Sequence, residues 1–397
     1  LEVASLYNQG MPTNLLVNRN NYQSGNPTVF NTKQVVFDGT DTRLETNNEL
    51  SGGTYSISAW VKRDTIPSAW QYIVDFRKGN TSSQYVAYNA SGGFGVGSGS
   101  AIIYLDGVTS STAPNDTEWH HVVVSGLTVG NSSYITIGAR YTGSEALDGC
   151  ISQVGLWTGT LTADEVSSLY NHGLPIDLTT DQAAYASSSN LVGYWRMGSG
   201  TLDTFPLIAD QTNATLGSEQ VTNGDFSTNS DWDLGSSWSI SDGKANYDAV
   251  TTASELRQLM SSIAVGTTIK IQFDILDVEA GKDAFFKLEI DGTPEAVFGY
   301  TKFSAGTYTY YHTIATDFDR LTFFPLNTST GGAFSIDNIS VKQVNGNPAI
   351  MTNQTASDIE NGSPFANEVE NGTFETEVTT SQWLNFGSPT TAARSTT

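Results

Sequence analysis

Short runs in which apolar and polar residues alternate recur along the chain, and one longer run has helical spacing. In the first half, the alternating runs lie at 35–39, 55–62, 118–124 and 147–157. Alternation with a period of two predicts strands with one buried and one exposed face. Residues 161–173 instead show the period of a helix. This order predicts a β-sandwich with a single surface helix.

The predicted helix carries signals for both of its ends. Thr162 is the expected N-cap, and Glu165, three residues later, completes a capping box. Gly173 followed by Pro175 is expected to end the helix. We expect the helix to pack on the rim of the sandwich as a structural anchor.

A second series of alternating runs fills the later part of the chain. It opens at 221–227, closes at 334–341, and contains Asp-Gly or Gly-rich turns that favour hairpins. A further run at 191–198 follows the polar stretch 179–190 and is expected to return to the first sandwich. The fold class predicted for the whole chain is therefore all-β, built from tandem antiparallel β-sandwiches.

Two segments near the termini repeat segments of the interior. Residues 2–15 nearly repeat 165–178, and residues 369–376 repeat 221–228. We therefore expect the chain to be a piece of a longer tandem array. The boundaries predicted from this pattern are a tail of a preceding unit at 1–20, a first sandwich at 21–217, a second sandwich at 218–345, and a linker with the start of another sandwich at 346–397.

The composition of the chain excludes two classes of binding partner. Among 397 residues there are 18 basic and 41 acidic ones, which give a net charge of −23. This charge would repel nucleic acid phosphates and anionic lipid head groups, so both are excluded as partners. The single cysteine, Cys150, cannot form an intramolecular disulfide and is expected to be a buried core residue. The chain has no apolar run of 18 residues and no signal-peptide pattern.

No combination of residues predicts catalysis. Glu289, Asp291 and Glu295 are the only acids spaced as a possible carboxylate pair, but Asp-Gly and Pro294 favour a hairpin turn there. His120 and His121 are adjacent and would point to opposite faces of a strand, so they cannot share one metal ion. We expect no catalytic residue in this chain.

The sequences of these runs resemble those of known families. The runs of the first half resemble the laminin-G-like domain of the concanavalin A-like lectin/glucanase superfamily. The opening at 223–226 and the closing run at 336–341 resemble the jelly roll of carbohydrate-binding modules. The phrases at 193–198 and 347–353 resemble virion fibre and capsid-decorating proteins of marine bacteriophages.

The resemblance to sandwich lectins and binding modules implies a structural calcium ion, since such domains hold Ca²⁺ with carboxylates and carbonyls. The residues expected to bind it are Asp38, Asp41 and Asp148 in the first sandwich, and the carbonyl of Asn223 and the carboxylate of Asp337 in the jelly roll. Ser227 stands where the binding modules usually have an acidic residue. The alternative is that these acids are ordinary turn residues in contact with water.

Glycan binding requires exposed aromatic rings beside polar groups. The candidates are Trp70, Tyr72, Tyr85 and Tyr88 near loops of the first sandwich, and Tyr300, Tyr310 and Tyr311 on late strands. The alternative for each is a place in the core.

Two functions follow from the resemblance. The first is a non-enzymatic virion-surface or extracellular adhesion protein, whose modules bind cell-surface glycans and which associates with copies of itself or with other virion proteins. The second is a set of binding modules appended to a secreted polysaccharide-degrading enzyme or a bacterial adhesin.

Overall fold

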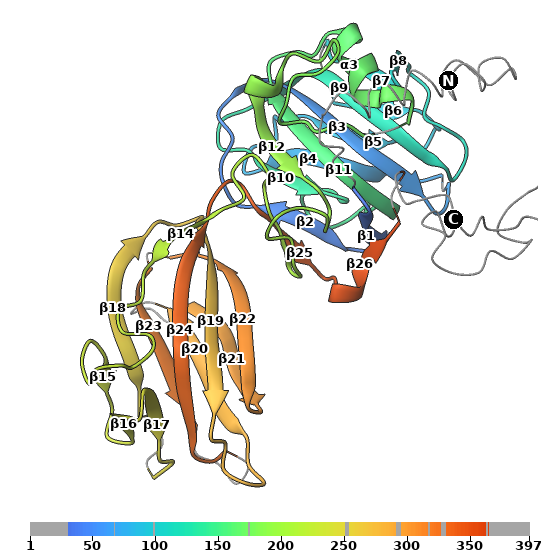
Figure 1. Cartoon of the computed structure of the whole chain (residues 1–397). Helices are drawn as coiled ribbons and strands as arrows, with labels where there is room; N and C mark the ends of the chain where they lie inside the picture. Colours follow the sequence, from blue (N-terminus) through green and yellow to red (C-terminus); the bar gives the residue numbers. More distant parts are fainter. Residues whose placement is uncertain are drawn as a thin grey trace, which may run out of the picture.

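The computed structural model describes residues 31–362 and 364, except 67, 98, 99, 174, 251–253, 291–294, 317 and 327–330. Within these residues the strands form four antiparallel sheets, which pair into two β-sandwiches joined end to end (Figure 1). The predicted all-β fold is confirmed. The expected unit at 1–20 and the repeat at 369–376 lie outside the described residues.

Two sheets make the first sandwich. The eight-stranded sheet has the order β26 (Ile359–Asn361), β1 (Lys33–Asp38), β11 (Asp148–Thr158), β3 (Gly53–Arg63), β9 (Trp119–Val129), β7 (Ile102–Leu105) and β8 (Val108–Thr109), and β12 (Leu191–Trp195) also pairs with β11. The seven-stranded sheet has the order β13 (Leu207–Ile208), β25 (Ala349–Thr352), β2 (Arg43–Thr46), β10 (Tyr134–Ile137), β4 (Gln71–Lys78), β5 (Tyr85–Tyr88) and β6 (Phe94–Gly95).

The outer face of the eight-stranded sheet is covered by a helical layer. Helix α3 (Ala163–Tyr170) begins at Thr162, whose hydroxyl accepts a hydrogen bond from the Glu165 amide, as the predicted capping box requires. The helix ends one turn earlier than predicted, because Asn171 takes a left-handed conformation and a 3₁₀ turn (Asn171–Gly173) follows. The helix and the segment after it bury Val123 and Trp157, so β9 and β11 are apolar on both faces. Two further 3₁₀ turns span Ser188–Asn190 and Ala356–Asp358.

The second sandwich is the predicted jelly roll. Its six-stranded sheet has the order β16 (Trp238–Ser241), β17 (Lys244–Tyr247), β24 (Phe334–Val344), β19 (Thr268–Leu276) and β22 (Gly306–Thr313), and β14 (Leu216–Glu219) also pairs with β24. Its five-stranded sheet has the order β15 (Asp233–Leu234), β18 (Leu256–Ile263), β23 (Phe318–Pro325), β20 (Ala284–Ile290) and β21 (Glu295–Phe303). Phe273, Phe286 and Phe323 contact one another in edge-on or tilted ring pairs between the two sheets.

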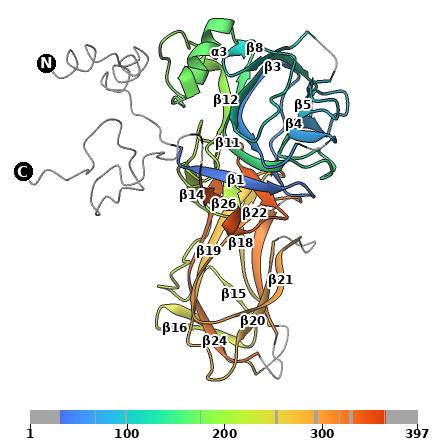
Figure 2. The same cartoon turned by 90° about the vertical axis from the view of Figure 1, so that its right-hand side faces the viewer.

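The predicted linker at 346 is wrong for its first residues, because these complete the first sandwich. Strand β25 lies between β2 and β13, and β26 pairs with the edge of β1. In Figures 1 and 2 both strands, coloured red, lie on the upper body although the jelly roll precedes them in sequence. Ala349 and Met351 are buried in the first core. The jelly roll is therefore inserted between two strands of the first sandwich.

The junction between the sandwiches is built around Asp210, which is 1% exposed. Its carboxylate accepts hydrogen bonds from the amides of Tyr194, Thr212 and Asn347 at 2.9–3.0 Å. Tyr194 precedes the jelly roll in sequence, and Asn347 follows it. Tyr311 of the jelly roll packs here against Leu207 and neighbouring apolar residues. The two segments that connect the sandwiches are thus held together by hydrogen bonds to Asp210.

Candidate functional site

An aromatic–arginine cluster, consisting of Trp70, Tyr72, Arg77 and Tyr85, lies on the outer face of the seven-stranded sheet. The rings of Tyr72 and Tyr85 are 5.2 Å apart between centroids, and Trp70 lies 6.1 Å from Tyr85 with its ring edge-on. The guanidinium carbon of Arg77 lies 4.3 Å from the centre of the Tyr85 ring and 5.2 Å from that of Tyr72. Three of the four predicted glycan-binding residues therefore come together, and two of them, Tyr72 and Tyr85, contact one cation.

Buried Asp75 fixes the arginine of this cluster. The Asp75 carboxylate is fully buried and accepts hydrogen bonds from Nε and Nη2 of Arg77 at 2.9 and 2.8 Å. It also accepts one from the Tyr141 amide at 3.0 Å. Burial alone would lower the pKa of Arg77, but the hydrogen bonds to Asp75 raise it above its ordinary value. The guanidinium is thus charged and held in one orientation.

A glycine on the next strand makes room for the indole. A Cβ atom at Gly95 would lie 2.3 Å from Cζ3 of Trp70, so any larger residue would displace the ring. Trp70 and Tyr85 are both partly exposed. A ring pair of this kind can stack on the apolar face of a sugar while a nearby charged donor orients its hydroxyl groups.

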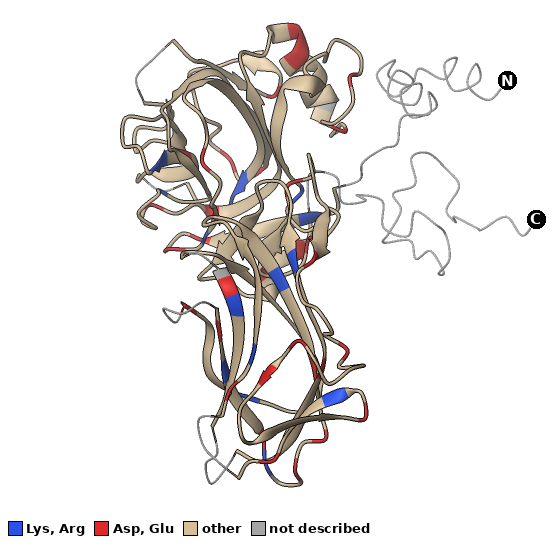
Figure 3. Ribbon diagram, turned by 90° about the vertical axis from the view of Figure 1, so that its left-hand side faces the viewer, with Lys and Arg blue, Asp and Glu red and all other residues tan. Residues whose placement is uncertain are grey.

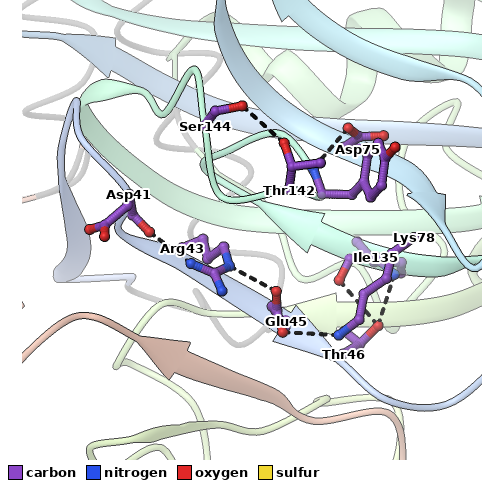
Figure 4. A network of polar contacts seen from close by, with 10 residues as sticks. Asp41, Arg43, Glu45, Thr46, Asp75, Lys78, Ile135, Thr142 and Ser144 are labelled. Atoms are coloured by element: carbon purple, nitrogen blue, oxygen red, sulfur yellow. Dashed lines mark hydrogen bonds and ion pairs between the residues drawn. The ribbon is translucent and has the colours of Figure 1, made fainter.

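The remaining outer face of this sheet is occupied by paired charges. Glu45 accepts hydrogen bonds from Arg43 at 2.7 Å and from Lys78 at 2.9 Å, and these pairs form the row of contacts in Figure 4. Burial raises the pKa of Glu45, but its two basic partners lower it more, so the pKa lies below its ordinary value. The cluster contributes two partly exposed rings, Trp70 and Tyr85, to this face.

The other predicted aromatic residues lie elsewhere. Tyr88 is 2% exposed and points into the first core, where Arg63 lies 4.2 Å from its ring centre. Tyr310 stacks on Phe273 inside the jelly roll. Tyr311 belongs to the junction, as described above, whereas Tyr300 is 46% exposed. Tyr88, Tyr310 and Tyr311 are thus corrected to packing roles.

The acids predicted to bind calcium in the first sandwich lie close together but have other partners. Asp38 and Asp148 face each other across β1 and β11. The Asp38 carboxylate accepts hydrogen bonds from the Thr40 amide and the Thr42 hydroxyl at 2.9 and 2.8 Å, and Asp148 accepts one from the Thr65 hydroxyl. The carbonyl of Asp41 accepts a hydrogen bond from Arg43. These oxygens act mainly as turn and strand-end caps.

In the jelly roll, Asp337 has other acidic residues near it. Burial raises the pKa of Asp337, and the nearby charges of Asp274 and Asp225 raise it further. The carbonyl of Asn223, however, already accepts the indole N–H of Trp232 at 3.0 Å. Across the described part of the chain, no group of three His, Cys, Asp or Glu side chains is placed to hold a metal ion.

Among the residues considered for catalysis, Glu289 and Glu295 have structural partners, and Asp291 lies outside the described residues. Glu289 pairs with Lys287, and Glu295 accepts hydrogen bonds from His312 and from the Ala315 and Thr316 amides. His121 is buried, which lowers its pKa to about 4. Cys150 is buried as predicted, and burial raises the pKa of its thiol to about 12. No helix in the described ranges is both long and apolar enough to cross a lipid bilayer.

Sequence reasoning missed Arg77 and Asp75. Both lie on β4 at positions i and i+2, so alternation places them on the same face. Alternation along β5 also places Tyr85 and Tyr88, at positions i and i+3, on opposite faces of the sheet. The signal for the cluster was thus present in the strand pattern.

Comparison with known proteins gives one partial family match. Residues 38–126 match the concanavalin A-like lectin/glucanases superfamily, in the family Laminin_G_3. This segment runs from the end of β1 into β9 and includes all four cluster residues. No curated protein matches the chain.

Several solved structures are similar to part of the chain. The CBM22-1 xylan-binding domain from Paenibacillus barcinonensis is 12% identical, with a TM-score of 0.25, and the match covers 34% of this chain and 97% of that one. The second N-terminal cellulose-binding domain of β-1,4-glucanase C from Cellulomonas fimi is 16% identical, with a TM-score of 0.26, over 32% of this chain and 92% of that one. The enzymatically active domain of bacteriophage CBA120 tailspike protein 4 is 15% identical, with a TM-score of 0.24, over 32% of this chain, which spans 21% of that structure.

Proposed function

We propose that this chain is a non-enzymatic adhesion protein that binds glycans through the aromatic–arginine cluster of its first sandwich. The observation that carries the proposal is the grouping of Trp70 with Tyr72 and Tyr85, whose rings contact an arginine that a buried carboxylate holds in place. Aromatic rings with one oriented polar group suit sugar recognition. The similarity of residues 38–126 to the lectin/glucanases superfamily supports the same ligand class.

We propose a virion surface or an extracellular location for this function. A net charge of −23 keeps such a surface away from nucleic acid and from anionic lipid. A single module with one small aromatic cluster binds weakly, so attachment would rely on many copies in a fibre or capsid decoration. The second candidate is a binding module appended to a polysaccharide-degrading enzyme, which the similarity to xylan- and cellulose-binding domains favours.

Binding is tested first on a glycan array with the full chain and then by calorimetry with the best glycan. Replacing Trp70 by alanine is expected to weaken binding about tenfold, or about 1.4 kcal/mol, because the sugar loses its stacking surface. The matched control is Phe205→Ala, which removes a partly exposed ring away from the cluster. Glycan binding that is equal in both variants would overturn the proposed site.

Catalysis is tested on the same material. The purified chain is incubated with the glycan that it binds best, and the release of reducing ends is measured. We expect none, because the weighed acids are engaged in structural pairs. Release that is lost in Glu289→Gln would contradict the non-enzymatic proposal.

A further inference from the structure

We infer that the outer face of the five-stranded sheet of the jelly roll is a second binding site, and that its ligand is an anionic polysaccharide. The site, here called the Arg320 face, consists of Arg257, Lys287, Tyr300, Arg320 and Phe324. It lies on the other sandwich from the aromatic–arginine cluster, and its evidence is independent of that cluster.

Strand register places these residues on one face. Arg257 pairs with Thr322, and Leu259 with Arg320, across β18 and β23. Lys287 pairs with Phe324 across β20 and β23. The residues that alternate with them, such as Leu321 and Phe323, are buried in the core. The side chains of the Arg320 face therefore point away from the core.

Arg320 differs from the other basic residues of this face because its charge is not neutralised. Arg257 pairs with Asp233 at 2.9 Å and Lys287 pairs with Glu289. Arg320 has no ion-pair or hydrogen-bond partner in the part of the chain that the structure describes, although its Nε is buried. A partly buried guanidinium without an anion is unfavourable, so it favours a ligand that brings one.

The scarcity of basic residues makes this arrangement specific. The chain has 18 basic residues against 41 acidic ones, and Figure 3 shows how few blue segments lie among the red on both sandwiches. A ligand with carboxylate or sulfate groups would be repelled by most of this surface. It would be attracted to Arg320, which has no acidic partner among the described residues, whereas Arg257 and Lys287 of the same face are paired with acids.

Aromatic rings on the same face select a sugar rather than a simple anion. Tyr300 is 46% exposed and lies 5.7 Å from Phe285 between ring centroids. Lys287 lies 4.5 Å from the ring centre of Phe324 and 5.6 Å from that of Tyr300, so a cation lies between two rings. Sugar faces stack on such rings while their acidic groups reach the basic side chains.

The opposite end of the face is hollowed. Two pockets of about 280 and 310 Å³ meet at Arg257 and Asp233, one lined also by Leu234 and Glu255 and the other by Trp232 and Asp231. Five strands at a spacing of about 4.8 Å separate these pockets from Tyr300 by about 19 Å. That span fits a polymer crossing the strands better than a single monosaccharide.

The test measures binding of the full chain to polygalacturonate, dextran sulfate and neutral dextran by isothermal titration calorimetry at two salt concentrations. We expect salt-sensitive binding to at least one polyanion and none to dextran. Comparison of polygalacturonate with dextran sulfate distinguishes a carboxylate from a sulfate as the preferred group. Replacing Arg320 by glutamine should weaken polyanion binding about tenfold, and Arg320→Lys should retain part of it.

The controls separate this site from general charge and from the first sandwich. Lys270→Gln removes one basic residue from the outer face of the other jelly-roll sheet and should leave binding unchanged. Tyr300→Ala should weaken binding, and Trp70→Ala should not. The inference is overturned by failure of both polyanions to bind, by equal losses in Arg320→Gln and Lys270→Gln, or by loss in Trp70→Ala, which would place the polyanion on the first sandwich. Unchanged melting temperatures show that each variant is folded.

Discussion

The two sandwiches are closed in different ways. The described strands of the jelly roll come from one continuous segment, Leu216 to Val344. The first sandwich takes strands from both sides of that segment, since β25 and β26 return to it after the jelly roll. The jelly roll can therefore form from local chain order alone, whereas the first sandwich has to wait for its last strands. Contact between residues so far apart carries a larger loop-closure cost.

The two sandwiches also differ in how their outer faces use charge. On the seven-stranded sheet of the first sandwich, Arg43, Arg77 and Lys78 each have an acidic partner. On the five-stranded sheet of the jelly roll, Arg320 has none among the described residues. The proposed glycan site on the first face would therefore rely mainly on rings, and the proposed site on the second face would rely on charge.

Removal of the last strands gives the largest expected effect. Terminating the chain after Asn345 deletes β25 and β26 and exposes the core around Ala349 and Met351. Truncating one buried methionine side chain already costs about 2–5 kcal/mol, so losing both strands should unfold the first sandwich. The jelly roll should keep its own unfolding transition. Calorimetry combined with limited proteolysis measures both.

The matched control for that deletion terminates the chain after Pro364 and keeps both strands. Both transitions should then be present. If the shorter chain retains a folded first sandwich, β25 and β26 are dispensable and the proposed difference in closure fails. If both sandwiches unfold, the stability of the jelly roll depends on the folded first sandwich.

The junction gives the next largest effect. Replacing Asp210 by alanine leaves the buried amides of Tyr194 and Asn347, and the partly buried amide of Thr212, without their acceptor. Each unsatisfied buried donor costs about 1–3 kcal/mol, so we expect a loss of about 3 kcal/mol or more. Denaturant unfolding measures the change, with the exposed residue Asp319→Ala as control. Equal stability of the two variants would show that the junction contributes little.

The helix and the strands of the first sandwich could be predicted from sequence because their signals are local. The capping box at Thr162 and Glu165 and the alternation in β3, β9 and β11 are visible within a few residues. Strand β25 could not be placed in the same way. It is four residues long, and its partners β2 and β13 lie far away in sequence on the other side of the inserted domain. The sequence of such a short strand does not specify which strand it pairs with.

For the candidate site too, the sequence indicates the individual residues but not the contacts that bring them together. Trp70, Tyr72 and Tyr85 could be proposed as exposed rings, but their convergence on Arg77 depends on the pairing of β4 with β5. The role of Asp75 also depends on the Tyr141 amide, which comes from a distant loop. Tyr311 could not be distinguished from a ligand-binding ring, because only the junction reveals the residues that cover it.

A smaller effect, specific to the first sandwich, is expected from pH. His120 bridges Asp106 and Asp116 at 2.7 and 2.8 Å. The hydrogen bond to Asp106 raises its pKa above the ordinary value of about 6.5, although burial opposes this. The stabilisation is therefore fully present below pH 6.5 and is lost as the pH rises through the raised pKa. We expect His120→Gln to cost at most about 1 kcal/mol at pH 5.5 and less at pH 9.

Unfolding of the wild type and the variant across this pH range measures the difference between them. Asp116→Asn, which leaves the hydrogen bond to Asp106, should show an intermediate effect. The jelly-roll transition should not change with either variant. A difference between wild type and His120→Gln that is constant with pH would exclude a charged bridge.

Calcium gives the smallest expected effect and contrasts the acids of the two sandwiches. Around Asp337, burial and the neighbouring charges of Asp274 and Asp225 raise the pKa, so a divalent cation would relieve repulsion there. Asp38 instead has its oxygen satisfied by Thr40 and Thr42. We therefore expect added calcium to stabilise the jelly roll, by about 1.4 kcal/mol at ten times its Kd. The stabilisation should disappear in Asp337→Asn and persist in Asp38→Asn. Identical melting in calcium and in chelator would mean that neither group of acids holds a stabilising ion, and loss of the effect in Asp38→Asn would move the site to the first sandwich.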